Sequence, residues 1–289
     1  MCLSKVGLVL EGGANRGIFT AGVLDCLKEH NIYLPYVVSV SVGTCNAIDY
    51  ISRQVGRTRT CMIPKGRNIP PICWRNIFTK KSIINLDLVF DEYPNHLVPF
   101  DYETFWSSDI VSEYVVTNCL TGKAEYFSPP ESRNAKKLMD ICRASCSMPY
   151  LLPEIFLDGV PYLDGGCADP IPFKHAIKQG YEKNIVVVTR EKGYYLEDKA
   201  RWMLRLESLL YRKYPDFVQL ISDSNRRYRE ILTEMNTLER QGKLLVIRPT
   251  KVLVSRLDNN EKRLENFYKQ GYDIAKNRLV EIQQFIVGK

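Results

Sequence analysis

Short apolar runs alternate with amphipathic stretches along most of this chain. Val6–Leu10 and Pro35–Val40 have the length and the β-branched content of buried strands, and each is followed by residues at helical spacing. The first of these helices is expected to reach about His30, and the second about Arg53. Another buried strand is expected at Ile185–Thr189. Strands that alternate with helices favour an α/β fold whose mostly parallel sheet is covered on both faces.

Two hairpins are expected in the middle of the chain. Thr121-Gly122 and Asp158-Gly159 are turn signals, and each stands between two short runs of strand-forming residues. The paired runs are Tyr114–Cys119 with Ala124–Phe127, and Ile155–Leu157 with Pro161–Leu163. Between the two hairpins, Asn134–Cys146 has helical spacing.

The C-terminal part of the chain is mainly helical in pattern. The expected elements are, in order, the helices Ala200–Tyr211 and Asp216–Gln241, the strand Leu244–Ile247 and the helix Asn260–Val287. The sequence has no internal repeat and no low-complexity linker. Residues 1–289 are therefore expected to form a single domain, with a C-terminal helical segment at about residues 255–289.

Composition and charge narrow the class of protein only slightly. Hydrophobic residues make up 45% of the chain and the net charge is +7, both ordinary for a globular protein. Neither a signal peptide nor an apolar run long enough to span a bilayer is visible, so a cytoplasmic protein is expected. The nine cysteines include no C-x-x-C pair, which favours buried, reduced thiols over a zinc site. We expect no metal and no cofactor.

The window from Tyr50 to Leu86 contains eight Lys and Arg residues and no Asp or Glu. Aromatic residues such as Trp74 are interleaved with the basic ones, and Pro70-Pro71 interrupts any long helix. One interpretation of this basic excursion, at about residues 50–86, is a solvated surface. A more specific one is peripheral contact with the anionic inner surface of a membrane, since basic side chains are attracted to anionic lipid. No nucleic-acid motif accompanies the window, so nucleic acid is not an expected partner.

Ser41 is the candidate nucleophile. A β-branched run that begins at Val37 ends in Ser41, and Gly43 follows two residues later. This is the spacing of a nucleophile elbow, a sharp strand-to-helix turn that exposes one serine hydroxyl. The usual G-x-S-x-G pattern has glycine where Ser39 stands, which is a mild departure because serine is also small. A buried strand followed by an ordinary Ser/Gly turn is the alternative.

A glycine-rich loop joins the first strand to the first helix. Because the strand before it is expected to lie beside the strand that carries Ser41, the backbone N–H groups of Gly12, Gly13 and Ala14 could converge on the same point and stabilise an oxyanion. Glycine there lets the backbone approach a substrate without a Cβ atom in the way. Arg16 beside the loop could fix its shape or assist the anion.

The general base is harder to assign from sequence. Only three histidines are present: His30, His96 in an expected loop at Pro94–Pro99, and His175. Nothing marks any of them as catalytic. Asp164 ends an expected strand and is followed by Gly165-Gly166, which suits a carboxylate that projects into a crowded site. Asp164 could then take the serine proton directly in a Ser–Asp dyad. Taken alone, an aspartate in this position is more often an ordinary turn residue.

Three motifs in this order resemble the patatin-like phospholipase family, and its bacterial branch in particular. They are Gly12-Gly13-Ala14-Asn15-Arg16-Gly17, Ser39-Val40-Ser41-Val42-Gly43 and Asp164-Gly165-Gly166. The resemblance implies a three-layer α/β/α patatin-like fold with a mostly parallel central sheet. It also implies a serine hydrolase of the phospholipase A or lysophospholipase type, acting on phospholipid or other lipid esters. Ser41 and Asp164 match the family's catalytic pair, and Gly12, Gly13, Ala14, Arg16 and Gly17 match its oxyanion loop.

Two departures from the family pattern leave other functions open. Ala14 replaces a third glycine and adds a methyl group to the loop, and Ser39 replaces the first elbow glycine. One alternative is an inactive family member that serves as a membrane or protein binding module. A less favoured one is a nucleotide-binding protein, since Gly12-x-Ala14-x-x-Gly17 fits a loose dinucleotide fingerprint.

Overall fold

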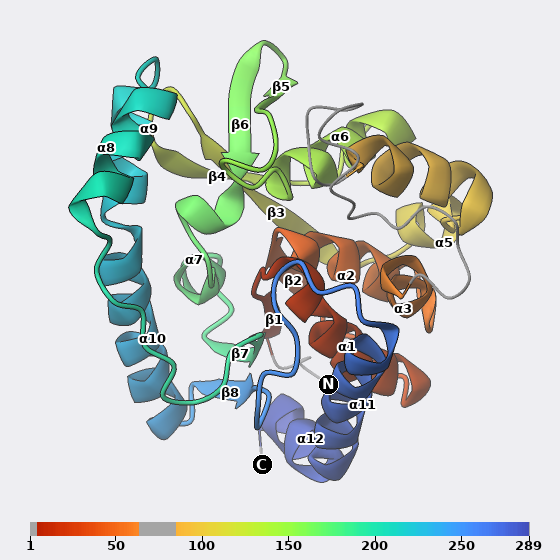
Figure 1. The fold of residues 1–289 in the computed structure, drawn as a ribbon. Helices are drawn as coiled ribbons and strands as arrows, with labels where there is room; N and C mark the ends of the chain where they lie inside the picture. The colour runs from red at the N-terminus through yellow and green to blue at the C-terminus, as the bar shows by residue number, and fades with distance from the viewer. Residues whose placement is uncertain (1–4, 64–84, 289) are drawn as a thin grey trace.

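A computed structural model describes residues 5–63 and 85–288. Its centre is one sheet (Figure 1). The strands are β1 (Val6–Leu10), β2 (Tyr36–Val40), β3 (Val111–Asn118), β4 (Lys123–Phe127), β5 (Ile155–Leu157), β6 (Val160–Asp164), β7 (Lys183–Val187) and β8 (Leu244–Ile247). Their order across the sheet is β5-β6-β3-β2-β1-β7-β8, with β4 paired to β3.

Helices surround this sheet. Those before the second hairpin are η1 (Ala14–Gly17), α1 (Ile18–Glu29), α2 (Val42–Ile51), α3 (Arg57–Met62), η2 (Leu88–Leu97), α5 (Tyr102–Trp106) and α6 (Ala135–Ser145). Those after it are η3 (Gly165–Cys167), α7 (Phe173–Lys178), α8 (Arg201–Leu210), α9 (Pro215–Ser222), α10 (Ser224–Arg240), α11 (Glu261–Asn277) and α12 (Leu279–Val287).

The sheet is mostly parallel, as the sequence predicts. Strands β3, β2, β1, β7 and β8 run parallel to their neighbours in that order, whereas β4 and β6 run antiparallel to β3, and β5 antiparallel to β6. The two glycine turns therefore form the two expected hairpins, β3–β4 and β5–β6. All five residues of β1 and all five of β2 are buried, which explains why these strands read as continuous apolar runs.

Each face of the sheet is covered by its own set of helices (Figure 1). Because successive strand residues point to opposite faces, Leu8 and Leu10 pack with α1, α2, α6 and α11, whereas Val9 packs with α7 and α10. These two cores make the expected three-layer α/β/α arrangement. The carboxyl ends of β1, β2 and β7 meet at one edge of the sheet, where the glycine loop and Ser41 follow directly.

The C-terminal helices pack closely on the first helix. A Cβ atom on Gly22 of α1 would lie 2.1 Å from the carbonyl oxygen of Tyr268, and one on Gly271 of α11 would lie 2.1 Å from that of Phe19. Only glycine at both positions lets the two backbones approach this closely. The last strand, β8, also extends the sheet beside β7. The C-terminal segment thus shares its core with the part that carries the motifs.

The structure corrects three sequence-based element predictions. The helix expected over Asp216–Gln241 is two helices, α9 and α10, separated at Asp223, and the helix expected over Asn260–Val287 is α11 and α12, separated at Arg278. The residues at the two breaks, Asp223 and Arg278, are neither Pro nor Gly, so no helix-breaking residue in the sequence indicates them. The segment around His96, expected as a loop, belongs to the helical segment η2, which contains Pro94.

The basic excursion expected at about residues 50–86 can be compared only in part, because residues 64–84 lie outside the described chain. Within the described part, two of its arginines are held by acids from outside the window. Arg57 is buried against Asp49, 2.7 Å away, and Arg59 forms an ion pair with Glu265. Each of these two positive charges therefore has an acidic partner within the protein. In residues 5–63 and 85–288, none of the helices has both the length and the apolar character needed to cross a bilayer.

Candidate active site

Ser41 stands at a strained turn between β2 and α2. Its backbone has φ 56° and ψ −134°, a conformation that residues other than glycine rarely adopt and that is held only where the surroundings enforce it. Gly43 makes the turn possible, since a Cβ atom there would lie 2.8 Å from the carbonyl oxygen of Leu10. The turn predicted from the Ser41–Gly43 spacing is present.

A buried chain of hydroxyl groups supports this turn. The backbone N–H of Ser41 donates to Ser145 Oγ at 2.9 Å, and that hydroxyl donates to the carbonyl oxygen of Val115 at 2.7 Å. Thr44 Oγ1 lies 3.1 Å from Ser145 Oγ and accepts from Ser39 Oγ at 3.4 Å. Ser39, the departure from the usual elbow glycine, therefore has a hydroxyl neighbour in the core. Sequence reasoning missed Ser145, which reads only as one position on the buried face of α6.

Asp164 lies directly beside Ser41. Ser41 Oγ donates a hydrogen bond of 2.6 Å to Asp164 Oδ2, although 123 residues separate them in the chain. The second carboxylate oxygen, Oδ1, accepts from the backbone N–H of Gly166 at 2.8 Å. Both side chains are nearly enclosed, with exposed fractions of 5% for Ser41 and 6% for Asp164.

Burial changes the acidity of Asp164. Removal from water raises the pKa of its carboxyl group to about 6, because burial disfavours the charged form, while the hydrogen bonds from Ser41 and Gly166 lower the pKa only part of the way back. A carboxylate with this pKa is ionised at neutral pH and is a stronger base than an exposed aspartate. Two neighbouring groups, a hydroxyl and a carboxylate, are thus arranged for proton transfer.

The glycine loop lies against Ser41. A Cβ atom on Gly12 would be 2.7 Å from Ser41 Cβ, and one on Gly13 would be 2.7 Å from Thr189 Oγ1. Within the described part of the chain, the N–H groups of Gly12, Gly13 and Ala14 donate no hydrogen bond to another residue. Ala14 has φ 48°, a left-handed conformation that costs a residue with a side chain roughly 1 kcal/mol or more. The structure therefore shows why glycine is favoured at position 14.

Arg16 is buried beside the same loop without a full set of partners. Its exposed fraction is 8%, and its Nε atom has no hydrogen-bond partner. The pKa of the Arg16 guanidinium is lowered to about 10, mainly by burial and to a smaller extent by repulsion from Arg190. Glu11 is a nearby acid, but its two oxygens already accept from Tyr228 and Thr189, each at 2.6 Å. Arg16 thus keeps a buried Nε donor without a hydrogen-bond partner.

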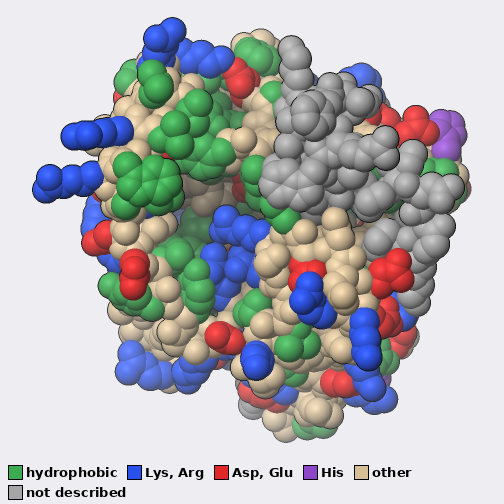
Figure 2. All heavy atoms as spheres, in the orientation of Figure 1, with side chains coloured by type: hydrophobic (Ala, Val, Ile, Leu, Met, Phe, Trp, Pro, Cys, Tyr) green, Lys and Arg blue, Asp and Glu red, His purple; other side chains and the backbone are tan. Residues whose placement is uncertain are grey.

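Two further arginines, missed by sequence reasoning, come to this loop from other parts of the chain. Arg190 follows Thr189, whose hydroxyl lies 2.9 Å from the Gly12 carbonyl oxygen, and it is also only 8% exposed. Its guanidinium lies over the Tyr194 ring at 3.7 Å and forms no ion pair with any described carboxylate. The backbone of Arg256 accepts from the N–H of Asn15 at 3.0 Å. Figure 2 shows basic side chains gathered in a hollow near the middle of this face.

An apolar cavity of about 130 Å³ opens beside Ser41. Ala14 and Ser41 are among its lining residues, together with side chains of α2, α3, η2 and α6. The apolar wall residues include Ile48, Met62, Val89, Phe90 and Met139. A cavity of this character suits a hydrocarbon chain. Apolar space and unpaired arginines are thus both present around the glycine loop and Ser41.

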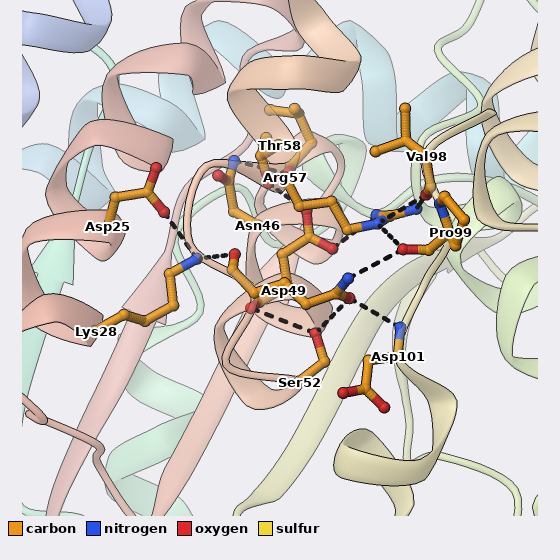
Figure 3. Close-up of polar contacts among 12 residues, drawn as sticks. Asp25, Lys28, Asn46, Asp49, Ser52, Arg57, Thr58, Val98, Pro99 and Asp101 are labelled. Atoms are coloured by element: carbon orange, nitrogen blue, oxygen red, sulfur yellow. Dashed lines mark hydrogen bonds and ion pairs between the residues drawn. The ribbon is translucent and has the colours of Figure 1, made fainter.

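A buried polar network supports the wall of this cavity (Figure 3). Asp49 accepts from Arg57 at 2.7 Å and from the Thr58 hydroxyl at 2.6 Å, so it fastens the start of α3 to α2. Arg57 also donates to the carbonyl oxygen of Val98 at 2.8 Å, which holds the segment after η2. Helix α2, helix α3 and the segment after η2 are therefore held together by one buried ion pair, Asp49–Arg57.

Replacing Asp49 by alanine is expected to lower the free energy of unfolding by roughly 3–5 kcal/mol, because it leaves the buried Arg57 charge without its partner. Urea unfolding measures the change. The matched control is Asp140→Ala, which removes the partner of the exposed Lys136 on α6 and is expected to change stability by less than about 1 kcal/mol. Equal effects of the two substitutions would contradict the role given to Asp49.

The three histidines make their contacts elsewhere. His30 Nδ1 lies 2.8 Å from the carbonyl oxygen of Cys26, and His175 Nε2 lies 2.8 Å from Glu113, with its ring stacked on Tyr126. His96 is exposed on η2. In residues 5–63 and 85–288, none of these rings contacts Ser41 or Asp164, and no group of three or more His, Cys, Asp or Glu side chains could hold a metal ion.

The fold and this site define an α/β protein with an elbow serine at the edge of its sheet. A family model for patatin-like phospholipases matches residues 8–177, more than half of the chain, so the chain belongs to the patatin-like phospholipase family. A second model, for a domain of unknown function, matches residues 214–287. The first match contains the glycine loop, Ser41 and Asp164, and the second contains α9 to α12 with β8 between them.

Several known proteins are similar to this chain. The uncharacterized protein YjjU of Escherichia coli (strain K12) is 28% identical over 278 residues, which are 92% of this chain and 75% of YjjU. Lysophospholipase NTE1 of Candida albicans is 27% identical over 187 residues, which are 63% of this chain but only 13% of that much longer protein. The crystal structure of VipD from Legionella pneumophila has the same fold, with a TM-score of 0.51 at 13% identity, over 96% of this chain and 67% of VipD.

The family and its lysophospholipase relatives support a lipid hydrolase activity.

Proposed function

We propose that this protein is a carboxylic ester hydrolase that releases fatty acid from phospholipid or lysophospholipid. Ser41 is the nucleophile and Asp164 its base. The observation that carries the proposal is the 2.6 Å hydrogen bond between Ser41 Oγ and Asp164 Oδ2 at an enclosed turn. Nucleophilic catalysis requires an adjacent base within this reach.

The reaction divides into two halves. Ser41 Oγ attacks the acyl carbonyl carbon and gives its proton to Asp164, and the alcohol leaves with that proton as the acyl-serine ester forms. Water then attacks the ester, gives a proton to Asp164, and the fatty acid and free Ser41 are released as the proton returns to Ser41 Oγ. The N–H groups of Gly12, Gly13 and Ala14 are the proposed donors to the oxyanion in both halves.

The unpaired arginines support a substrate that carries phosphate. Buried charges are normally paired, yet neither Arg16 nor Arg190 forms an ion pair with a described carboxylate, and the charge of Arg190 is close enough to lower the pKa of Arg16. Arginine binds phosphate oxygens through its planar set of donors. We place the phosphate of the substrate on this side of Ser41 and its acyl chain in the apolar cavity.

Replacing Arg190 by glutamine is expected to lower kcat/KM for lysophosphatidic acid about 10- to 100-fold, the worth of one charge-assisted hydrogen bond. Hydrolysis of a monoacylglycerol with the same acyl chain should change little, because that substrate has no phosphate. Arg240→Gln, at the exposed end of α10, is the control. An equal loss on both substrates would show that Arg190 supports the fold rather than the substrate.

The proposal as a whole is tested by incubating the purified protein with a panel of esters and measuring released fatty acid. The panel contains phospholipids, lysophospholipids, a monoacylglycerol and a short-chain nitrophenyl ester. We expect release from the phosphate-bearing lipids and none with Ser41→Ala. Failure to hydrolyse any of these esters would favour a binding module built on the same fold.

We further propose that residues 1–289 act as one domain, since α11 packs tightly on α1 and β8 completes the sheet. The described cysteines are all free thiols, which supports a reducing, cytoplasmic compartment. Peripheral contact with a membrane surface would bring such an enzyme to its lipid.

A further inference from the structure

Helix α8 shows an unusual distribution of side chains. Its one buried residue is an acid, Glu207, at 2% exposure. Its large apolar side chains face outward instead, with exposed fractions of 66% for Trp202, 43% for Leu206, 64% for Leu209 and 51% for Leu210. Figure 2 shows hydrophobic side chains gathered over the region where Figure 1 places α8, with Lys and Arg side chains projecting around them.

Polar contacts, rather than apolar packing, attach this helix to the protein. Glu207 accepts from the Tyr150 hydroxyl at 2.6 Å and forms an ion pair with Lys199. Lys199 also donates to the carbonyl oxygen of Ile221 at 2.6 Å, at the end of α9. The Tyr211 hydroxyl, one residue past the helix, accepts from the N–H of Tyr150 at 2.7 Å. Apart from Leu204, which is half-buried, the apolar side chains of α8 are therefore left out of the core.

The exposed side of α8 is divided into two stripes. At about 100° per residue, Trp202, Leu206 and Leu209 lie within an arc of roughly 60°, and Leu210 borders it. Arg201 and Arg205 lie within the adjoining arc of roughly 40°, and Arg212 follows two residues after the end of α8. All three arginines are exposed, and the helix's own acid points inward. We call these seven residues the docking face.

We propose that the docking face binds the surface of an anionic lipid bilayer, with α8 parallel to the membrane plane. Helices that lie in the interface combine an apolar stripe, often with Trp or Leu, and a basic stripe that meets anionic headgroups. The arginines supply the charge complementarity, and the internal Glu207 removes the one charge of the helix that such a surface would repel. In water this arrangement exposes apolar area with no benefit to the fold.

The position of α8 gives this binding a purpose, which rests on the proposed function. Tyr150, the partner of Glu207 and Tyr211, lies two residues after Met148, which lines the apolar cavity beside Ser41. One short loop thus connects the docking face to the cavity. Binding to a bilayer would hold the cavity close to the lipid that it is proposed to accept.

The test measures binding separately from hydrolysis by using the Ser41→Ala protein throughout. Co-sedimentation is compared with vesicles of phosphatidylcholine alone and of phosphatidylcholine with phosphatidylserine. We expect binding to the anionic vesicles, and a loss of at least about tenfold in affinity for each leucine changed in Leu206→Glu and Leu209→Glu. Replacing Arg201, Arg205 and Arg212 by glutamine should weaken it about fivefold per arginine.

Val280→Glu is the matched control, because Val280 is 67% exposed on α12 and lies outside the docking face. It should bind like the parent protein. The changed residues are exposed, so the variants are expected to fold. To verify this, the same substitutions are made in the protein that retains Ser41, and its hydrolysis of a soluble ester should be unchanged. If the protein that retains Ser41 shows no ester hydrolysis, circular dichroism is used to verify that the variants fold. The binding result can then still be interpreted, because it does not depend on the hydrolase proposal.

A spectroscopic measurement locates the contact. The fluorescence of Trp202 should shift to the blue on adding anionic vesicles, and Trp202→Phe should lose this shift while retaining most of the binding. The proposal is overturned if the parent protein does not bind anionic vesicles, or if the leucine variants bind as well as Val280→Glu. It is also overturned if the parent is a dimer that the leucine substitutions convert to a monomer, since the face would then be a contact between copies.

Discussion

Replacing Ser41 by alanine is expected to reduce kcat/KM for a lipid ester by at least about 1,000-fold. The loss is large because the substitution removes the attacking oxygen, and what remains is only the assistance that the oxyanion donors and binding give to water. The fold should be unaffected, since the strained backbone at Ser41 is held by its N–H bond to Ser145 and not by its side chain. Steady-state kinetics and thermal unfolding measure the two effects.

Ser39 provides the matched control for this experiment. It lies two residues earlier, in β2, and is fully buried, with its hydroxyl 3.4 Å from Thr44 Oγ1. Ser39→Ala should therefore keep most of the activity. Full activity in Ser41→Ala, or equal losses in the two variants, would show that the elbow does not supply the nucleophile.

Replacing Asp164 by asparagine is expected to lower kcat/KM by at least about 100-fold, the usual worth of a positioned general base. Asparagine retains the shape of the side chain and can still accept from the Gly166 N–H, so the geometry of the turn should survive. His175→Gln is the control, because that ring is engaged with Glu113. A larger loss in His175→Gln than in Asp164→Asn would contradict the dyad.

The raised pKa of Asp164 predicts the direction of two pH effects, one on kcat/KM and one on stability. As the base must be ionised, kcat/KM should fall about tenfold per pH unit below about 6 in the parent protein. In the folded protein the pKa of Asp164 lies above its value in the unfolded chain. The fold therefore loses stability as pH rises from the ordinary aspartate pKa of 3.8 to about 6, because Asp164 becomes ionised. Asp164→Asn removes that penalty and should stabilise the fold by up to roughly 3 kcal/mol at neutral pH and above. Lower stability in Asp164→Asn would contradict the raised pKa of Asp164.

The strands and the elbow could be predicted from sequence because their signals are local. The apolar run of β1, the run that ends in Ser41 and the two glycine turns each specify their own geometry within a few residues. The predicted partner of Ser41, Asp164, depended on the order of motifs. The structure brings the two together through the pairing of β3 with both β2 and β6.

The supporting residues could not be predicted because their roles exist only in three dimensions. Ser145 is an ordinary position on an amphipathic helix until α6 places it beneath the Ser41 turn. Arg190 follows a strand and gives no motif of its own. The acid-free window from Tyr50 to Leu86 suggested free basic charge, but Arg57 and Arg59 find their acids in Asp49 and Glu265, outside the window.

The orientation of helix α8 could not be predicted from the sequence either. Its periodicity predicts an amphipathic helix, and the usual expectation is that the apolar stripe faces the core. In the structure the contacts of Glu207 with Lys199 and Tyr150 reverse this orientation. Which stripe of a short helix is buried depends on partners that the helix's own sequence does not contain.

The central claim is that Ser41 is a nucleophile activated by Asp164, and covalent labelling tests it most directly. The protein is treated with a fluorophosphonate, which reacts with activated serines, and the modified residue is located by peptide mass spectrometry. We expect one adduct, on Ser41, that forms much more slowly in Asp164→Asn and not at all in Ser41→Ala. A labelled serine elsewhere, or a folded protein that takes up no label, would contradict the account.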